Sequence, residues 1–212
     1  MEFFDLTEPL TSGMTGFPGD PSVELVGVRS HEVDGYQVTK ICVGSHSGTH
    51  LDAPRHFFAD GQTLDSFPLE RLIGPGIVVD CRPHAEPSDT QEPAPGAPAP
   101  VLTVTADLLA ERLRPFPIPP GGFVLLHTGG ALLTVEAARL LLDGGAGVVG
   151  VDSPSPDERP HPVHKLLLGH GILLAENLRG LDRIEPGPVT CACLPLAVVG
   201  TDGAPARIVA WR

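Results

Sequence analysis

The sequence predicts a single mixed α/β domain with many strands and few short helices. First, its 212 residues fall within the size range of one domain, and a chain of this length buries a core without disulfides or a structural metal. Second, apolar runs of strand length are followed by short segments with helical periodicity. Third, 25 glycines and 24 prolines make up close to a quarter of the chain, which is typical of many turns and short elements.

The elements are expected next to their own start and stop signals. Residues 23–28 follow the turn-forming segment 17–21. Thr105 and Thr134 stand where N-caps of two helices would be, and the glycine pair at 144–145 would end the second helix. The expected strands are 23–28, 36–43, 76–81, 123–128, 148–152, 172–176, 189–199 and 207–211, and the expected helices are 105–113, 134–142 and 162–168.

One segment, residues 83–100, interrupts this alternation with six prolines and four alanines among polar residues. We interpret it as a long surface loop, because a proline-rich stretch of this length neither packs as a strand nor continues a helix. It is not expected to be a linker. The whole chain, 1–212, is therefore expected to be one domain.

Composition and charge exclude several classes of protein. The 26 acidic residues outnumber the 14 lysines and arginines, and the net charge of −12 disfavours binding to nucleic acid or to an anionic membrane surface. No run of 18 apolar residues could span a membrane, and the first residues do not resemble a signal peptide, so a cytoplasmic location is expected. The four cysteines are expected to be free thiols, with Cys42 and Cys81 in the core and Cys191 and Cys193 on one strand face.

The most informative segment is residues 46–57, HSGTHLDAPRHF, which holds three histidines and a carboxylate within eleven residues. On a strand, His50 and Asp52 would share one face at about 6.6 Å between Cα atoms, a suitable spacing for one metal. His46 would lie about 13 Å from His50 in a straight strand, so the chain must bend, and Gly48 permits the bend. Imidazole and carboxylate together suit zinc, manganese or iron, and a set without cysteine favours a catalytic metal.

This segment is similar to the signature of the cyclase-like metal-dependent hydrolase family. Weaker similarities to the same family extend over nearly the whole chain, at residues 5–10, 17–20, 150–155, 164–178 and 204–207. The resemblance implies a domain of the swivelling β/β/α type that assembles into a homodimer or homotetramer.

The resemblance also implies roles for individual residues. Five side chains would hold two divalent metals per chain, zinc first and manganese as the alternative: His46, His50, Asp52, His164 and Glu176. Asp52 would bridge the two metals, and His56 would be the catalytic acid and base. The apolar run before Glu176 independently predicts a buried carboxylate, which needs a partner such as a metal.

Other candidates surround this set. Phe17 stands where the family's formamidases carry a tryptophan that contacts substrate. Gly130 stands where many members have an aromatic residue. Both differences are expected to leave fewer aromatic atoms in the wall of the substrate pocket. Phe17 is the candidate substrate contact. Three side chains are candidates for the pocket or for orienting a metal ligand: Asp152, His127 and His170. Three others lack ligand spacing and are expected to be exposed: His31, His84 and His161.

The implied reaction is hydrolysis of an amide C–N bond by metal-activated hydroxide, with His56 moving protons. It is expected to be arylformamidase-like, converting N-formylkynurenine and water to kynurenine and formate. One alternative is a cyclic amide such as isatin, or another small amide. A second alternative is a non-catalytic, metal-dependent binding protein on the same fold, which would need no acid or base. The expected partner is a small-molecule amide, with no nucleic acid and no membrane.

Overall fold

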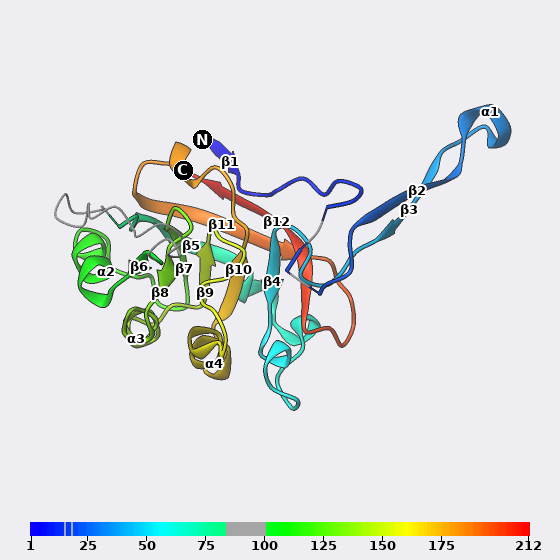
Figure 1. The fold of residues 1–212 in the computed structure, drawn as a ribbon. Coiled ribbons are helices and arrows are strands. Elements are labelled where there is room, and N and C mark those ends of the chain that lie inside the picture. The colour runs from blue at the N-terminus through cyan, green and yellow to red at the C-terminus, as the bar shows by residue number, and fades with distance from the viewer. Residues whose placement is uncertain (15, 18, 84–100) are drawn as a thin grey trace, which may run out of the picture.

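Seven strands close into a barrel in this computed structural model, which describes residues 1–14, 16, 17, 19–83 and 101–212. Around the ring the strands follow the order β12, β11, β5, β7, β9, β10, β4, and β4 pairs with β12 again (Figure 1). Their bounds are β4 His50–Asp52, β5 Ile73–Asp80, β7 Phe123–His127, β9 Val148–Val151, β10 Leu173–Glu176, β11 Gly187–Pro195 and β12 Gly203–Trp211. The mixed α/β class is thus confirmed. The swivelling β/β/α assignment stays a prediction.

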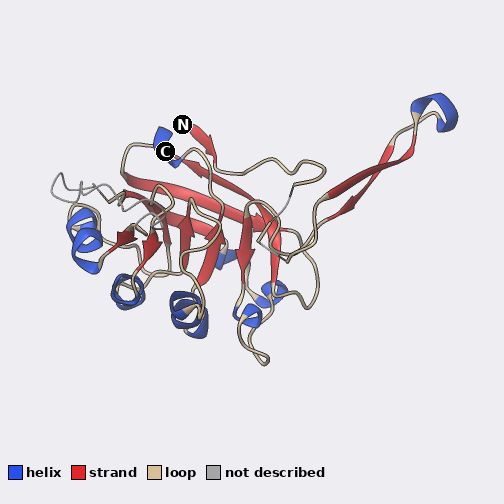
Figure 2. Cartoon of the chain, viewed as in Figure 1, coloured by secondary structure: helices blue, strands red, loops and turns tan. Residues whose placement is uncertain are grey.

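The middle of the barrel wall is parallel and covered by helices. Strands β5, β7, β9 and β10 run parallel, and β9, β10, the first four residues of β7 and residues 76–79 of β5 are buried, as a helix-covered parallel sheet requires. Helices α2 (Ala106–Leu113), α3 (Val135–Asp143) and α4 (Pro162–Gly169) lie along one side of these strands (Figure 2). The side chains of Thr105 and Thr134 cap α2 and α3 as expected, each accepting a backbone N–H three residues on.

The side chains of these strands alternate between two cores. Phe123 and Leu125 pack inside the barrel, whereas Val124 and Leu126 pack against the helices. Both Cys191 and Cys193 point into the barrel core, where burial raises the pKa of the Cys191 thiol to about 12. The pair is therefore a packing element and presents no thiolate to a metal.

One edge of β12 is shared by two short strands. Strand β4 pairs with its first residues, from Gly203 to Pro205, and β1 (Phe3–Asp5) pairs with its last residues, from Val209 to Trp211. On its other side β4 pairs antiparallel with β10, which places Glu176 opposite His50. Glu176 ends its strand, as the expected range 172–176 predicted, and this strand lies beside the histidine-rich segment. Three-residue β4 is thereby held in register from both sides.

A two-stranded arm leaves the body of the molecule (Figure 1). It consists of β2 (Glu24–Arg29) and β3 (Val38–Cys42), joined at the tip by the short helix α1 (His31–Asp34). Every residue of β2 is exposed. Cys42 lies on this arm and is partly exposed, so its expected place in the core was wrong, whereas Cys81 is buried as predicted.

Some expectations fall outside these elements. The proline- and alanine-rich stretch 83–100, with His84, lies outside the described residues except for Pro83. Helix α1 and the paired two-residue strands β6 (Thr103–Val104) and β8 (Leu132–Leu133) were not expected. In the parts of the chain that the structure describes, the helices are too short and too polar to cross a bilayer.

Candidate metal centre and active-site pocket

Two glycines shape the segment that carries the first three candidate ligands. Gly48 has a backbone φ of +60° and a Cβ there would lie 2.7 Å from Leu10 Cδ2, so the position requires glycine. The bend at Gly48 that the sequence predicted is present, and it turns His46 back toward β4. Gly203, opposite Asp52 on β12, leaves room for the His46 ring, since a Cβ there would lie 2.9 Å from His46 Cε1.

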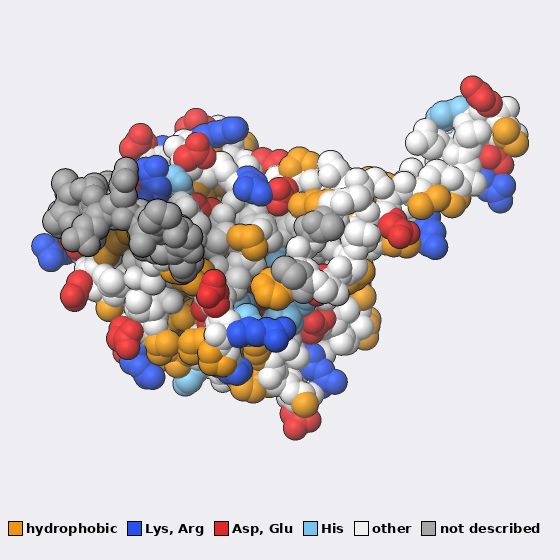
Figure 3. Space-filling model, in the orientation of Figure 1, with side chains coloured by type: hydrophobic (Ala, Val, Ile, Leu, Met, Phe, Trp, Pro, Cys, Tyr) orange, Lys and Arg blue, Asp and Glu red, His pale blue; other side chains and the backbone are white. Residues whose placement is uncertain are grey.

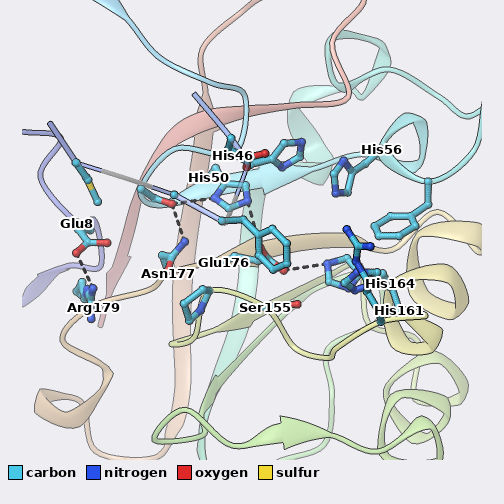
Figure 4. A pocket seen from close by; sticks show the side chains of 18 of the residues that line it. Glu8, His46, His50, His56, Ser155, His161, His164, Glu176, Asn177 and Arg179 are labelled. Carbon is cyan, nitrogen blue, oxygen red and sulfur yellow. Dashed lines mark hydrogen bonds and ion pairs between the residues drawn. The ribbon is translucent and has the colours of Figure 1, made fainter. Parts of the chain in front are cut away.

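Four of the five predicted metal ligands, His46, His50, His164 and Glu176, lie around the same pocket (Figure 4), and Asp52 contacts the three histidines. His50 Nε2 lies 3.3 Å from Asp52 Oδ1 and 3.3 Å from Glu176 Oε2. His164, from α4, places Nε2 at 3.0 Å from Glu176 Oε1 and 3.8 Å from Asp52 Oδ2. His46 completes the group with Nδ1 at 2.7 Å from Asp52 Oδ1. Four different parts of the fold therefore supply the cluster: the turn before β4, β4, α4 and the end of β10.

Two buried atoms at the centre of this cluster, His50 Nε2 and Asp52 Oδ2, have no hydrogen-bond partner among the residues that the structure describes. His50 Nδ1 donates to the carbonyl of Gly48 at 2.8 Å, so in the neutral ring the lone pair of Nε2 would face two carboxylates. A buried acceptor pointing at negative charge is unfavourable unless a cation or a proton lies between them. The donor set, with imidazole and carboxylate ligands, fits a divalent cation.

Asp52 is common to two such sets, which fits the predicted bridging role. His50, Asp52 and Glu176 offer ligand atoms within 4.8 Å of one another, and so do His46, Asp52 and His56. A carboxylate has two oxygens and can serve one site with each. The residues present are thus compatible with two adjacent cations that share Asp52.

The electrostatics of the cluster favour positive charge. Burial alone would lower the pKa of His164, but its hydrogen bonds to Asp157 and then to Glu176 raise that pKa to about 10. Burial opposes ionisation of Asp52 as well, yet the charge of His50 and the hydrogen bond from His46 hold the pKa of Asp52 well below its usual range. Without a metal, protons on the histidines neutralise the carboxylates. A divalent cation would take the place of those protons.

Two further carboxylates, Asp157 and Asp202, contact the ring nitrogens of candidate ligands, and neither was predicted. Asp157 accepts from His164 Nδ1 at 2.6 Å, as well as from the backbone N–H of Val163 at 2.5 Å. Asp202 lies 2.8 Å from His46 Nε2 and 3.2 Å from His56 Nδ1. Carboxylates in these positions fix the tautomer and the orientation of metal-binding histidines.

The three candidates chosen for that supporting role lie elsewhere. Asp152 accepts from the backbone N–H and hydroxyl of Thr128 at 2.9 and 2.6 Å and from Gly129, so it fastens the turn after β7. His127 Nε2 lies 3.6 Å from the same carboxylate. His170 Nδ1 donates to the carbonyl of Leu166 at the exposed end of α4. Their assignment to the pocket is corrected, since none of the three lines it and each is held by local contacts.

A pocket of about 950 Å³ opens beside the cluster. Phe17 lines it as predicted, although 43% of this residue is exposed. His161 was expected to be exposed, but it is half-buried in the pocket wall, with its ring centroid 5.4 Å from that of Phe57 and 6.5 Å from that of Phe17. Gly130 lies in the turn after β7 and does not line the pocket, so its lack of a side chain does not thin this wall.

His56 lies between the cluster and the pocket. It ends a single 3-10 turn, Pro54–His56, and its ring centroid is 4.0 Å from that of His46. Its side chain is 29% exposed, and burial lowers the pKa of the imidazole, so the ring is neutral at neutral pH. Because Nδ1 faces Asp202, Nε2 is the nitrogen left for other contacts. A neutral imidazole here can accept a proton from a group in the pocket.

Comparison with known proteins agrees with this picture. Residues 4–158 match the family model described as “Putative cyclase”. The chain is 30% identical to a kynurenine formamidase of Salinibacter ruber over 217 aligned positions, which cover 99% of this chain and 97% of the relative. A solved structure described as a potential metal-dependent hydrolase with cyclase activity has a TM-score of 0.76 at 28% identity, covering 99% of this chain and 96% of the other. An isatin hydrolase bound to the product analogue thioisatinate has a TM-score of 0.80 at 26% identity, with coverages of 99% and 91%.

Proposed function

The chain belongs to the cyclase family, and from that premise we propose that it is a metal-dependent hydrolase of amide C–N bonds. The observation that carries the proposal is the pair of partnerless buried atoms, His50 Nε2 and Asp52 Oδ2, beside a pocket that also contains the neutral imidazole of His56. Similarity to a kynurenine formamidase and to an isatin hydrolase, both named for amide hydrolysis, supports the same chemistry.

The proposed metal ligands are the five converging side chains, with zinc as the first choice and manganese as the alternative: His46, His50, Asp52, His164 and Glu176. Bound there, a divalent cation would polarise a substrate carbonyl and lower the pKa of water. Two cations per chain are proposed, because Asp52 contacts three of the candidate histidine ligands, His46, His50 and His164, and its carboxylate could be shared.

His56 is the proposed acid and base. Its Nδ1 is held by Asp202, so Nε2 would take a proton from the attacking water and then give it to the amide nitrogen as the C–N bond breaks. The carbonyl carbon gains the water oxygen, and the nitrogen leaves as an amine. Asp202 also contacts His46, so one carboxylate sets the orientation of both the acid and base and a metal ligand.

The proposed substrate is an arylformamide, with N-formylkynurenine first. Phe17, Phe57 and His161 give the pocket an aromatic wall, and its volume of about 950 Å³ accommodates a ring and its substituents. A cyclic amide of the isatin kind is the alternative, since it offers a similar ring. A metal-dependent binding protein on the same fold is the second alternative, but it gives no role to the His56–Asp202 pair.

The test is hydrolysis of N-formylkynurenine, formanilide and isatin by metal-loaded protein, with a chelated sample alongside. We expect kcat/KM above about 10⁴ M⁻¹s⁻¹ for one of them, and loss of turnover on chelation. A thermal melt with and without chelator accompanies the assay. Metal-loaded, folded protein that hydrolyses none of the three substrates would overturn the proposal and favour the binding protein.

We further propose that two chains associate through the β2–β3 arm. Apolar side chains on it are exposed to 37–63%: Leu25, Val26, Val28, Val38 and Ile41. An isolated two-stranded hairpin is only marginally stable in water, and this arm points away from its own body (Figure 3). A twofold axis would cover both arms at once, which supports the homodimer that the family resemblance implies. A homotetramer is the alternative.

A further inference from the structure

One arginine in the pocket wall, Arg159, has no role in the proposed reaction. Arg159 lies in the segment between Asp157 and α4, and this segment forms one side of the pocket. The residue is exposed, and within the described ranges its guanidinium makes no ion pair or hydrogen bond. The segment itself is fixed, because Asp157 accepts from the backbone at Val163 and lies 3.3 Å from His161 Nδ1. The backbone that carries Arg159 is therefore anchored beside the pocket.

The other charges of the pocket leave its mouth positive. Glu8 is paired with Arg179 at 2.6 Å, and Glu176 belongs to the metal cluster. Lys165 also lines the pocket, and its Nζ donates to the carbonyl of Pro160 at 2.6 Å, which holds the ammonium in place without neutralising it. Asp20, on the exposed turn that follows Phe17, is the remaining acidic residue in the lining.

This positive mouth is unusual for the chain, whose net charge is −12. In Figure 3, lysine or arginine atoms lie directly beside histidine atoms in the middle of the visible face. A cationic group at the entrance of a pocket, in an otherwise acidic protein, selects for substrates that carry negative charge.

We propose that the mouth of the pocket is a carboxylate-binding subsite, in which Arg159, assisted by Lys165, holds a carboxylate that the substrate carries in addition to its amide. The inference rests on the proposed function and narrows it to N-acylated or cyclic aryl amines with an acidic substituent. The planar guanidinium fork matches a carboxylate in geometry. A phosphate is disfavoured, because the first N–H groups of α4 at Val163 and His164 already bind Asp157 and Pro162 has none.

The experiment compares formanilide with the N-formyl derivatives of the three positional isomers of aminobenzoate. These substrates share the scissile bond and differ in the carboxylate and its position. For wild type we expect the best carboxylated substrate to exceed formanilide about tenfold in kcat/KM, mainly through KM. In Arg159→Gln this ratio should fall to near one, in Arg159→Lys it should be partly kept, and in the control Arg139→Gln, on the exposed surface of α3, it should be unchanged.

A binding measurement separates this inference from the proposed function. Calorimetry with the three aminobenzoates, with and without zinc, requires no turnover, and Arg159→Gln should weaken the best ligand about tenfold. Equal binding by wild type and Arg159→Gln would overturn the subsite even if the amides are hydrolysed. Conversely, a protein that binds the aminobenzoates through Arg159 but hydrolyses no amide would keep the subsite and refute the hydrolase. A preference for formanilide in wild type would also overturn the inference.

Discussion

Replacing Asp157 by asparagine is expected to weaken metal binding, because this carboxylate sets the tautomer of His164. His164 Nδ1 lies 2.6 Å from Asp157 Oδ1, while Asp157 Oδ2 accepts the backbone N–H of Val163 at 2.5 Å. A carboxylate accepts on both oxygens, whereas an amide accepts on one only. If the amide oxygen stays toward Val163, the amide NH₂ faces Nδ1 and the proton moves to Nε2, the nitrogen that points at Glu176. If the amide flips, its NH₂ opposes the backbone N–H.

The substitution removes one charge-assisted hydrogen bond and the His164 tautomer that leaves Nε2 available for a metal. These two losses set the expected decrease in metal affinity. Substitution of a carboxylate that orients a metal-binding histidine costs about 10- to 100-fold in metal affinity, or about 1.4–2.7 kcal/mol. The Asp157 contact is short, and it belongs to a residue that is 4% exposed, so solvent does not replace it. We therefore expect an effect near the upper end of that range.

The assay is competition for zinc with a chromophoric chelator at fixed pH, on wild type, Asp157→Asn and Asp152→Asn. Asp152 is a matched control, because it also binds backbone N–H groups and a hydroxyl but lies away from the cluster. Its variant should lose some stability and keep the wild-type zinc affinity. Zinc binding by Asp157→Asn within a factor of two of wild type would refute the reasoning. So would an equal loss in both variants, which would indicate a general effect on folding.

Three further outcomes are expected. His56→Ala should lower kcat about 10²–10⁴-fold while metal content, measured by elemental analysis, stays at the wild-type level; full activity would rule out the acid and base assignment. Zinc binding should release protons and strengthen as pH rises. In the metal-free protein the pKa of His50 lies well above its usual value and that of His164 is about 10, so both are protonated at neutral pH. Calorimetric enthalpies of zinc binding that do not depend on the buffer would contradict this. Ile41→Asp should raise the dissociation constant of the dimer about 100-fold in light scattering, whereas Leu69→Asp, which is equally exposed on the body, should not.

Most of the individual helices and strands can be predicted from the sequence. The closure of the strands into a barrel cannot. The parallel strands are short apolar runs, and the threonine caps mark where α2 and α3 begin. Each of these elements can therefore be predicted from about ten consecutive residues of its own. Strands β1 and β4 have three residues each and are ordered by pairing with β12, far along the chain. Nothing within such short segments distinguishes them from loops.

The same division holds for the site. The candidate ligands lie in two segments whose residue types suggest metal binding. The supporting carboxylates lie outside both segments, and the residues around them carry no such signal. Asp152 directly follows the buried strand β9, yet the chain turns its carboxylate toward Thr128. Asp157 and Asp202 lie in turns with no such pattern, and only the fold brings them against His164 and His46. Their roles depend on tertiary structure.

The shared edge of β12 has a consequence for how the protein is made. β4 emerges early in synthesis, but one of its two neighbours, β12, is about 150 residues further along the chain. Until β12 arrives, His50 and Asp52 lie on an unpaired edge, and pairings so distant in sequence form slowly. The candidate ligands His50 and Asp52 therefore gain their second strand neighbour only when β12 docks. We therefore expect metal binding to follow the docking of β12, and the barrel of the metal-free chain to open most easily at this seam.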